Sequence, residues 1–470
     1  MGKKTDILNF GNIDNISRRS MMGIVWSFSI PAILAQFTSV VMQYIDAAMV
    51  GSLGAGASAA IGLVSTTTWL MNGLCTAAVT GFSVQIAQLI GAKRDSDARS
   101  VFRQAFVLMM CFGLFMSVIA FSISSHLPAW LGGAKDIRAD SSKYFSIFAL
   151  ILPATQIRQL CAASLQCSGD MKTPSALSIA MCFMNVIFNF LFIYPSRTLI
   201  VFGNEIKIFG VGLGVSGAAY GTALAEYITA ILMLWRSGFK SKKLSFWGEG
   251  TWKIRKQCIK TALRVSLPAA FEHMIICGAY ICSTVIIAPL GKVPVAANSL
   301  AVTAESFCYM PGYGIGSAST TLVGQSLGAG RSDVAKRFAS TAVFLGVAIM
   351  TVTGALMFVI APLMFSLLTP DTGVRMLGTD ILRIEAFAEP LYAASIICAG
   401  ALRGAGDTFV PSLLNLASMW GVRITLSFIL VPHFGLHGAW IAMATELCVR
   451  GILFLIRLYR GKWAEKKLVV

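Results

Sequence analysis

Charged side chains are scarce in this sequence of 470 residues. Asp, Glu, Lys and Arg make up 13% of it, about half of their share in an ordinary soluble domain. Hydrophobic residues make up 56%, and the mean hydropathy is +0.73. These values exclude a disordered chain and argue against a soluble globular enzyme.

Several motifs of chemistry are also missing. No G-x-x-x-x-G-K-[ST] loop is present, which excludes a built-in ATPase of that type. None of the 11 cysteines forms a C-x-x-C pair, and most lie inside apolar runs, so we predict neither a disulfide framework nor a zinc site. No clustered nucleophile, base or metal set stands at the edge of an apolar run. We therefore predict that the protein is not an enzyme and carries no cofactor.

Apolar runs of about 20 residues, long enough to cross a bilayer, fill most of the chain instead. They predict an all-α integral membrane protein with twelve spans and little room for a soluble domain. The predicted spans are 24–49, 57–82, 101–124, 142–166, 174–195, 214–235, 262–287, 295–325, 338–366, 382–400, 410–431 and 436–458.

The net charge of +17 comes from 38 Lys and Arg against 21 Asp and Glu. Most of the basic residues fall in the termini and in the loops that follow even-numbered spans, whereas Arg158, Arg423 and Arg450 lie inside spans. The positive-inside rule then predicts that both termini are cytoplasmic. We attribute the basic balance to this topology, and we expect membrane lipids but no nucleic acid as partners.

The sequence repeats itself at a constant offset of 237 in the numbering. The segment at 29–32 (SIPA) matches 266–269 (SLPA), 88–92 (QLIGA) matches 325–329 (QSLGA), and 169–170 (GD) matches 406–407. After a shift to an offset of 221, 217–218 (GA) matches 438–439, so the first half carries extra residues, predicted as a polar loop around 197–207. Such parallel repeats of six spans are a design of secondary transporters.

The repeat predicts three parts of the chain. Residues 1–235 form an N-terminal lobe of six spans, 236–261 a basic cytoplasmic linker, and 262–470 a C-terminal lobe of six spans.

Ionisable groups inside a bilayer are costly and are functional candidates by default. Asp46, late in the first span, either caps the turn before Gly51 or binds and releases a coupling cation; we favour the second interpretation. Asn185 and Asn189, four residues apart, share one helix face, as do Thr222 and Glu226. These polar groups either bond helices together or supply neutral oxygen ligands beside Asp46.

Further acids lie in the second half. Glu272 follows Pro268 in the seventh span, Glu305 lies in the eighth, and Glu389 lies in the tenth. Unpaired acids facing a cavity would attract cationic substrates, and helix-packing hydrogen bonds are the alternative. We predict Glu272, Glu305 and Glu389 as substrate-binding residues, together with Gln36 and Tyr44 of the first span. Glu446 and Arg450 are instead predicted to be an i,i+4 ion pair.

The motifs in this order resemble the multidrug and toxic compound extrusion (MATE) family. The resemblance is carried by 400–408 (GALRGAGDT) with Pro411, its weaker copy at 165–170 (LQCSGD) with Pro174, Asp46 followed by Gly51 and Gly54, and 323–325 (VGQ) before 328–329 (GA). It covers essentially the whole chain. It implies two six-helix lobes around a V-shaped cleft and antiport, in which uptake of H⁺ or Na⁺ drives export of a drug-like, often cationic compound.

The resemblance also implies a cation-coupling site at Asp46, Asn185, Asn189 and Thr222. Asn189 departs from the Asp that is common at its position, which favours H⁺ over Na⁺ as the coupling ion, and apart from a Na⁺ ion at Asp46 no metal is predicted. Ile276 and Tyr392 stand where NorM-type members carry acids. The chain therefore looks closer to the DinF-like branch of bacterial members than to the NorM-type branch.

Two other transporter classes are weighed as alternatives. A major facilitator also has six plus six spans, but its loop signature is only loosely matched at 91–95 (GAKRD). A lipid-linked precursor flippase of related fold usually has more spans and a cationic cavity, whereas the candidate cavity charges here are mostly acidic. We therefore predict a monomeric antiporter of the bacterial inner (cytoplasmic) membrane that exports small organic cations.

Overall fold

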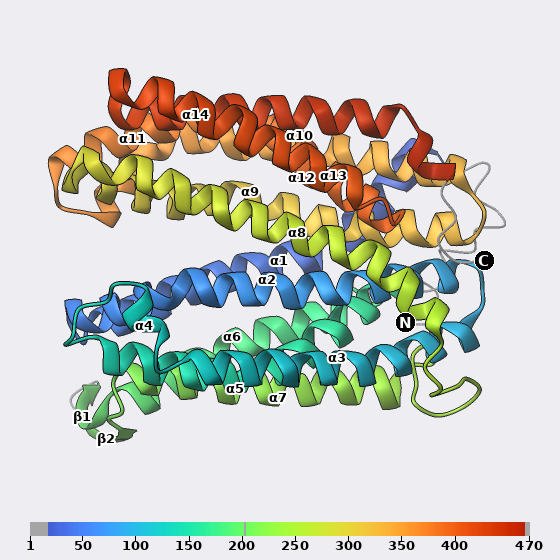
Figure 1. Cartoon of the computed structure of the whole chain (residues 1–470), viewed down its shortest axis with the longest axis horizontal. Coiled ribbons are helices and arrows are strands. Elements are labelled where there is room, and N and C mark those ends of the chain that lie inside the picture. Colours follow the sequence, from blue (N-terminus) through green and yellow to red (C-terminus); the bar gives the residue numbers. More distant parts are fainter. Residues whose placement is uncertain (1–16, 202–203, 466–470) are drawn as a thin grey trace.

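The computed structural model describes residues 17–201 and 204–465, and almost all of them are helical. The helices lie side by side along one direction (Figure 1). Those of the first half are α1 (Arg18–Gly51), α2 (Ala55–Gly91), α3 (Asp95–Ile123), the short α4 (Leu127–Trp130), α5 (Arg138–Cys167), α6 (Lys172–Ile193) and α7 (Val215–Trp235). Those of the second half are α8 (Lys256–Ile287), α9 (Lys292–Gly328), α10 (Ser332–Leu368), α11 (Thr372–Ala386), α12 (Glu389–Gly404), α13 (Phe409–Ser418) and α14 (Thr425–Tyr459).

The twelve predicted crossings are confirmed, although not each of them is a separate, uninterrupted apolar helix. Nine helices of the described residues are long and apolar enough to span a membrane, and the last of them, Phe409–Tyr459, holds two predicted spans. Its two parts meet at Gly435, whose φ of 55° and ψ of −135° are not helical. Helix α9 and the pair α11 and α12 supply the other two crossings. The tenth crossing is broken because Pro390 stands at the start of α12, where its missing N–H costs no helical hydrogen bond.

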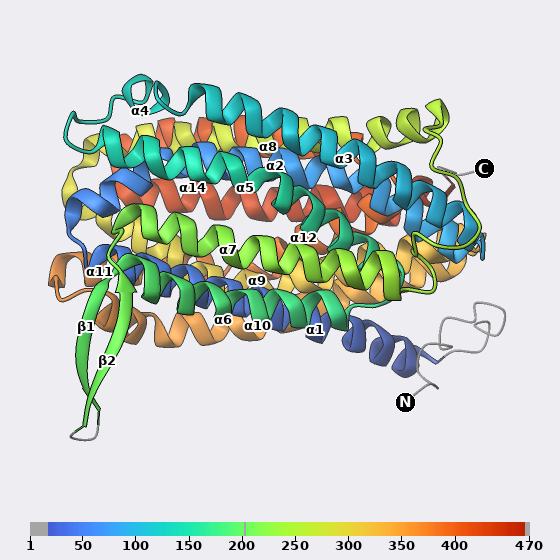
Figure 2. The same ribbon diagram turned by 90° about the horizontal axis from the view of Figure 1, so that it is seen from below.

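The extra residues of the first half are not the polar loop that the sequence predicts. They form an antiparallel hairpin of β1 (Pro195–Val201) and β2 (Asn204–Val211), in which Pro195 pairs with Val211 and Val201 with Asn204. The hairpin projects beyond the ends of α6 and α7 (Figure 2). Residues with high strand propensity, among them Ile200, Ile206 and Ile208, favour this form over an irregular loop.

The two halves exchange contacts near the middle of the molecule. Helix α1 packs on α9, and α2 packs on both α8 and α9. The first two long helices of each half therefore form the contact between the halves. Buried side chains of α1 and α9, among them Val25 and Ile315, share one hydrophobic core with α10 and α12. The predicted repeat is thus visible as a pair of structurally equivalent helices on either side of one contact.

The closest contact between the halves is reciprocal. A Cβ atom at Gly91 would collide with the carbonyl oxygen of Gln325, and one at Gly328 would collide with the carbonyl oxygen of Gln88. The side chain of Gln88 donates to the backbone oxygen of Gly404 at 3.4 Å, and that of Gln325 donates to the backbone oxygen of Cys167 at 2.7 Å. Each partner stands at the offset of 237 from its counterpart, as a two-fold axis between α2 and α9 requires.

The repeated Gly-Asp motif fastens the end of each half. Asp170 lies 3.4 Å from the guanidinium group of Arg236, and Asp407 accepts from Nε of Arg457 at 3.0 Å. The two arginines differ in number by 221, which is the second offset found in the sequence. In the first half the motif therefore connects the turn after the fourth crossing to the end of the sixth. In the second half it connects the turn after the tenth crossing to the end of the twelfth.

Substitution of either crossing glycine should loosen this contact. We expect Gly91→Ala and Gly328→Ala each to lower the free energy of unfolding by about 1–3 kcal/mol, because the added methyl group has no room beside the facing backbone. The two effects should be similar because the contacts are equivalent. Thermal unfolding of purified protein in detergent would measure them. Gly62→Ala on α2 is the matched control, since a Cβ there meets nothing within 4 Å; an equal loss of stability in that control would contradict the explanation.

Candidate functional site

The polar residues predicted for the first half meet at one place. Asp46 lies near the end of α1, half-buried, and faces α6. The amide nitrogen of Asn189 donates to Oδ1 of Asp46 at 2.8 Å. Asn185 and Asn189 are 2% and 1% exposed. Packing of α1 on α6 thus brings a carboxyl group against two amides that lie far from it in the sequence.

The amide of Asn185 completes the cluster. With its nitrogen turned toward Asp46, it donates to Oδ1 at 2.8 Å and to Oδ2 at 3.2 Å, and its oxygen accepts from the hydroxyl of Thr222 at 2.9 Å. This orientation directs the Asn185 nitrogen at the Asp46 carboxylate, whereas the opposite one would set two acceptors against each other. The fifth span thus packs on the first, and Thr222 of α7 supports Asn185 rather than contacting Asp46.

Glycine makes room for this arrangement. A Cβ atom at Gly221 of α7 would collide with Oδ1 of Asn189. That oxygen is buried and has no hydrogen-bond partner among the described residues. An unpaired buried oxygen costs free energy, and this cost accompanies the orientation that turns the Asn189 nitrogen toward Asp46. The cluster therefore offers one ionisable group surrounded by groups that adapt to either of its charge states.

The other acid inside a predicted span of the first half, Glu226, is paired with a base. Oε1 of Glu226 lies 2.6 Å from Nε of Arg158 on α5, and both side chains are largely buried. The sequence places Glu226 on one face with Thr222 but gives no sign of this partner, because Arg158 belongs to a different span. Of the two acids inside the predicted spans of the first half, Asp46 is therefore the one held by neutral groups.

The three acids predicted to bind substrate lie inside the second half. Glu272 is 9% exposed, Glu305 6% and Glu389 fully buried. The carboxyl group of Glu272 accepts from the amide of Asn415 on α13 at 2.7 Å. In this conformation its surroundings are helix-packing groups, the alternative that the sequence left open.

Glu305 and Glu389 belong to a cluster with a third acid, Glu385, which the sequence reasoning overlooked. A carboxyl oxygen from each of Glu305, Glu385 and Glu389 lies within 4.8 Å of the others, a spacing that could also hold a metal ion. The oxygens of Glu385 and Glu389 are buried without hydrogen-bond partners among the described residues. Three carboxylates this close cannot all be ionised in the absence of a cation. The spacing of four positions between Glu385 and Glu389, across the start of a helix, is the signal that could have revealed the cluster.

Two arginines lie near these acids. Glu446 and Arg450 form the predicted i,i+4 pair, 3.1 Å apart. The guanidinium group of Arg450 lies 5.4 Å from the centre of the Tyr392 ring, and that of Arg423 lies 5.3 Å from the Tyr280 ring. Tyr392 is one of the two positions where the chain departs from the NorM-type pattern, and it contacts a cation rather than acting as one of the acids.

The remaining two predicted substrate residues lie on α1. Tyr44 stacks on Phe307 of α9, with ring centres 5.4 Å apart, so it joins the two halves. Gln36 is partly buried two turns earlier in the helix.

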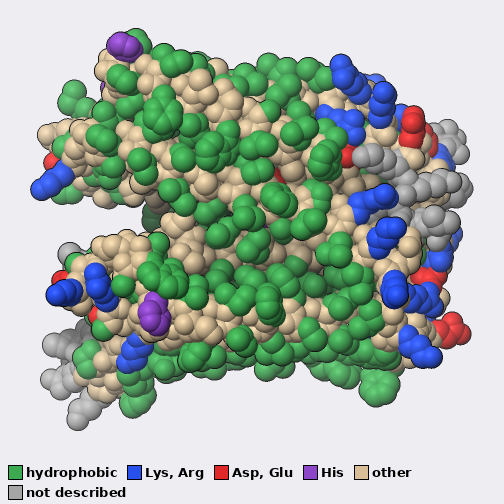
Figure 3. Space-filling model, in the orientation of Figure 1, with side chains coloured by type: hydrophobic (Ala, Val, Ile, Leu, Met, Phe, Trp, Pro, Cys, Tyr) green, Lys and Arg blue, Asp and Glu red, His purple; other side chains and the backbone are tan. Residues whose placement is uncertain are grey.

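Two hollows are available to a substrate. The surface of Figure 3 shows a notch between the two halves, at the end opposite the concentration of Lys and Arg side chains. A pocket of about 450 Å³ lies within the second half between α8, α9 and α14, a volume within the range of small-molecule sites. Of the described residues that line it, Arg423 is the charged one, and polar groups come from Asn298, Ser283, Ser299 and Thr303.

Comparison with known proteins identifies this architecture. Residues 31–191 and 268–429 each match the MatE family, and the starts of the two matches differ by the repeat offset found in the sequence. The chain belongs to the MatE family. The chain is 25% identical over 449 residues to the probable multidrug resistance protein NorM of Thermotoga maritima, covering 94% of this chain and 93% of the relative. It is also 25% identical over 470 residues to the multidrug resistance protein MdtK of Yersinia enterocolitica, covering 96% of each.

Solved structures share the fold of this MatE chain. A multidrug resistance MATE family transporter of the MOP superfamily, solved in an outward-facing conformation, superposes with a TM-score of 0.87 at 19% identity and covers 99% of each chain. A MOP superfamily transporter from Pyrococcus furiosus, whose title describes a binding pocket of reverse polarity, also gives 0.87, at 18% identity over 95% of this chain and 97% of its own. The predicted architecture of two lobes around a V-shaped cleft is confirmed.

Removal of Arg158 should destabilise the first half. We expect Arg158→Leu to lower the free energy of unfolding by about 3–5 kcal/mol, because it leaves the Glu226 carboxylate buried without its partner. Thermal unfolding in detergent would measure the loss. The double variant Arg158→Leu with Glu226→Leu should recover most of it. A double variant as unstable as the single one would show that packing of the arginine stem, rather than charge, is responsible.

Proposed function

We propose that the chain is a cation-coupled antiporter that exports drug-like, cationic organic compounds across the inner (cytoplasmic) membrane. The observation that carries the proposal is the cluster at Asp46, an ionisable group held inside the first half of a MatE chain by neutral amides. The names of the relatives, multidrug resistance proteins NorM and MdtK, support the substrate class, and as named transporters they support a non-enzymatic function.

We infer that H⁺ is the coupling ion. The amides of Asn185 and Asn189 direct N–H groups at Asp46, which stabilises the ionised carboxylate without a metal ion. A Na⁺ ion would require oxygens in their place. Protonation removes the charge that both amides bind, so the hydrogen bonds between α1 and α6 must rearrange. Pro31 within α1 is the place where that helix can bend.

The distribution of charge supports the orientation in the membrane. Lys and Arg side chains gather at the end where α1 begins and α14 ends (Figures 1 and 3), and the positive-inside rule assigns that end, and both termini, to the cytoplasm. The notch then opens to the outside. Inward opening requires separation of α2 from α9 at Gly91 and Gly328, and the ligands shift this equilibrium only through their differential affinity for the two states. We propose a monomer as the transporting unit, since each chain holds both halves.

The acids of the second half, Glu272, Glu305 and Glu389, are proposed to interact with the cationic substrate as the halves rearrange, with Gln36 and Tyr44 on the facing helix. Export of anionic compounds is a second candidate, because the charged residue lining the pocket of the second half is Arg423. Within the family, Ile276 and Tyr392 support the DinF-like branch, although the relatives named above are NorM and MdtK proteins.

Replacement of Asp46 tests the coupling site. In proteoliposomes, we expect wild-type protein to transport ethidium when a pH gradient is imposed and not when a Na⁺ gradient is imposed alone. Asp46→Asn should abolish this transport, because an amide cannot exchange a proton near neutral pH. Asp140→Asn, which removes a carboxyl group from an exposed position at the start of α5, controls for the loss of one negative charge.

Three outcomes would change the proposal. Transport by Asp46→Asn at the wild-type rate would move coupling away from the first half, toward Glu272 and Glu305. Transport driven only by Na⁺ would contradict the choice of ion. Transport of an anionic dye such as carboxyfluorescein in place of ethidium would favour the second candidate.

A second carboxyl group beside Asp46 should change the ion. In Asn189→Asp, the new side chain replaces an amide that lies 2.8 Å from Asp46, and two carboxylates so close bind a shared proton or a cation. We therefore expect a Na⁺ gradient to drive ethidium transport in this variant, with the pH-driven rate reduced at least severalfold. Asn185→Asp is the companion variant. Unchanged ion preference in both variants would argue that these amides do not contact the coupling ion.

A further inference from the structure

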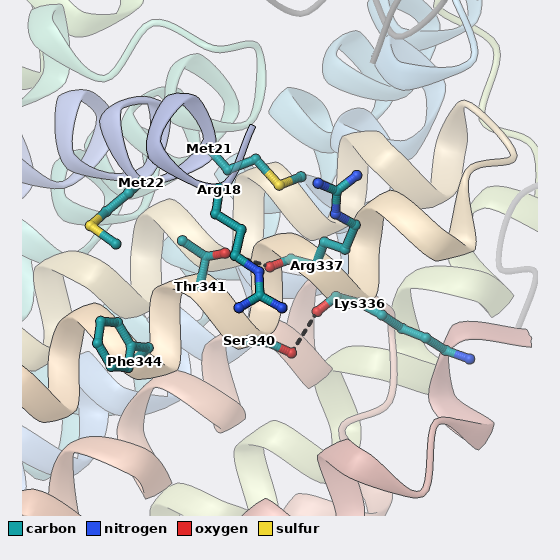
Figure 4. A pocket seen from close by; sticks show the side chains of 8 residues that line it. All are labelled: Arg18, Met21, Met22, Lys336, Arg337, Ser340, Thr341 and Phe344. Carbon is teal, nitrogen blue, oxygen red and sulfur yellow. Dashed lines mark hydrogen bonds between the residues drawn. The ribbon is translucent and has the colours of Figure 1, made fainter. Parts of the chain in front are cut away.

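A pocket of about 580 Å³ lies between the beginnings of two helices from different halves, α1 and α10 (Figure 4). The site described above does not use it. Among the residues that the structure describes, those lining it include three bases and no acid: Arg18, Met21, Met22, Lys336, Arg337, Ser340, Thr341 and Phe344. Its volume lies in the range of small-molecule sites, and its charge fits an anion.

The bases supply the hydrogen-bond donors of this pocket. The guanidinium group of Arg18 points from α1 toward α10 near Ser340, whereas the side chain of Lys336 extends away from it along the surface (Figure 4). Both Arg18 and Lys336 are exposed. The hydroxyl groups of Ser340 and Thr341 donate to backbone oxygens of their own helix at 2.9 and 2.8 Å. The hydroxyl protons are therefore already used, and an anion in the pocket would be bound by the cationic groups.

The rest of the wall is apolar. Met22 is partly buried and Phe344 is 64% exposed. Phe344 follows Lys336 by eight positions on the same helix, about 12 Å along its axis. A ligand that contacts both would have a charged end at the helix start and an apolar part that extends toward the middle of the span.

The pocket also lies at the depth where lipid head groups meet the protein. It is at the Lys- and Arg-rich end of α1 and α10, two helices that are long and apolar enough to cross the membrane. Basic pockets between helices on the cytoplasmic side attract anionic head groups, with about 1 kcal/mol from each basic residue near the surface.

We infer that this pocket binds an anionic phospholipid, with the head-group phosphate at Arg18, Lys336 and Arg337 and an acyl chain along Met22 and Phe344. The lipid is a bound partner and not the transported substrate, so the inference goes beyond the proposed function. Because the pocket joins α1 of one half to α10 of the other, a bound lipid favours the conformation in which these two helix starts are close.

Native mass spectrometry of the full chain in detergent tests the inference, with phosphatidylglycerol and phosphatidylcholine as probes. We expect wild-type protein to retain phosphatidylglycerol in preference to phosphatidylcholine. The double variant Arg18→Gln with Lys336→Gln should bind phosphatidylglycerol about 10- to 30-fold more weakly, as expected for two basic residues. The variant Arg18→Lys with Lys336→Arg keeps both charges and should bind within about twofold of wild type, which separates loss of binding from misfolding.

The matched control is Lys256→Gln with Lys260→Gln, which removes the same charge from exposed positions of α8 at the same end. An equal loss of phosphatidylglycerol in this control would overturn the inference, since the effect would then be one of net charge. Displacement of the lipid by millimolar inorganic phosphate would overturn it in favour of a free-anion site. Binding that appears only after deletion of residues 2–16 would show that this segment, with Asp6 and Asp14, is the occupant. Independence of these results from Asp46→Asn keeps them separate from the transport proposal.

Discussion

The contact between α2 and α9 is the constraint on which the rest of the structure depends. Two glycines, Gly91 and Gly328, allow each helix to rest on the backbone of the other, and no larger residue fits there. The molecule is therefore closed at its basic end and open as a notch at the opposite end. Alternating access requires that this contact separate when the notch closes.

Within each half, several buried charged side chains form ion pairs that hold the helices together. Arg158 with Glu226 and Arg457 with Asp407 each join two segments of one half, and Arg450 pairs with Glu446 on a single helix. Each pair avoids the cost of a lone charge in a low-polarity interior. Asp46 is different because its partners are amides. A group bound only by neutral dipoles gains or loses its charge without leaving an opposite charge unpaired, which is what a coupling site must do.

Much of this architecture could be predicted from the sequence because the bilayer imposes a simple length rule and the repeat imposes a second one. The spans, the two halves and the meeting of Asp46 with Asn185 follow from periodicity and resemblance. The β1–β2 hairpin was missed because its strands are short and lie between spans. Partners such as Arg158 for Glu226 and Asn415 for Glu272 depend on how each helix is rotated about its own axis relative to its neighbours. Helices that are apolar on all sides give no sequence pattern from which this rotation can be predicted.

The two halves of the repeat differ in their buried ionisable residues. The glutamines and glycines of the contact between α2 and α9 keep their counterparts at the offset of 237. The position equivalent to Asp46, however, is Ser283, and the position equivalent to Glu305 is Thr68. One half therefore carries a single carboxyl group among amides, and the other carries Glu305, Glu385 and Glu389 together with two arginines. Two halves that bound the same ion in the same way would respond alike to one ion gradient. The difference between their buried polar groups would then have no explanation. The halves thus share one reciprocal contact but differ in their buried polar groups, so a charge that is gained or lost at Asp46 has no equivalent at the same position of the other half.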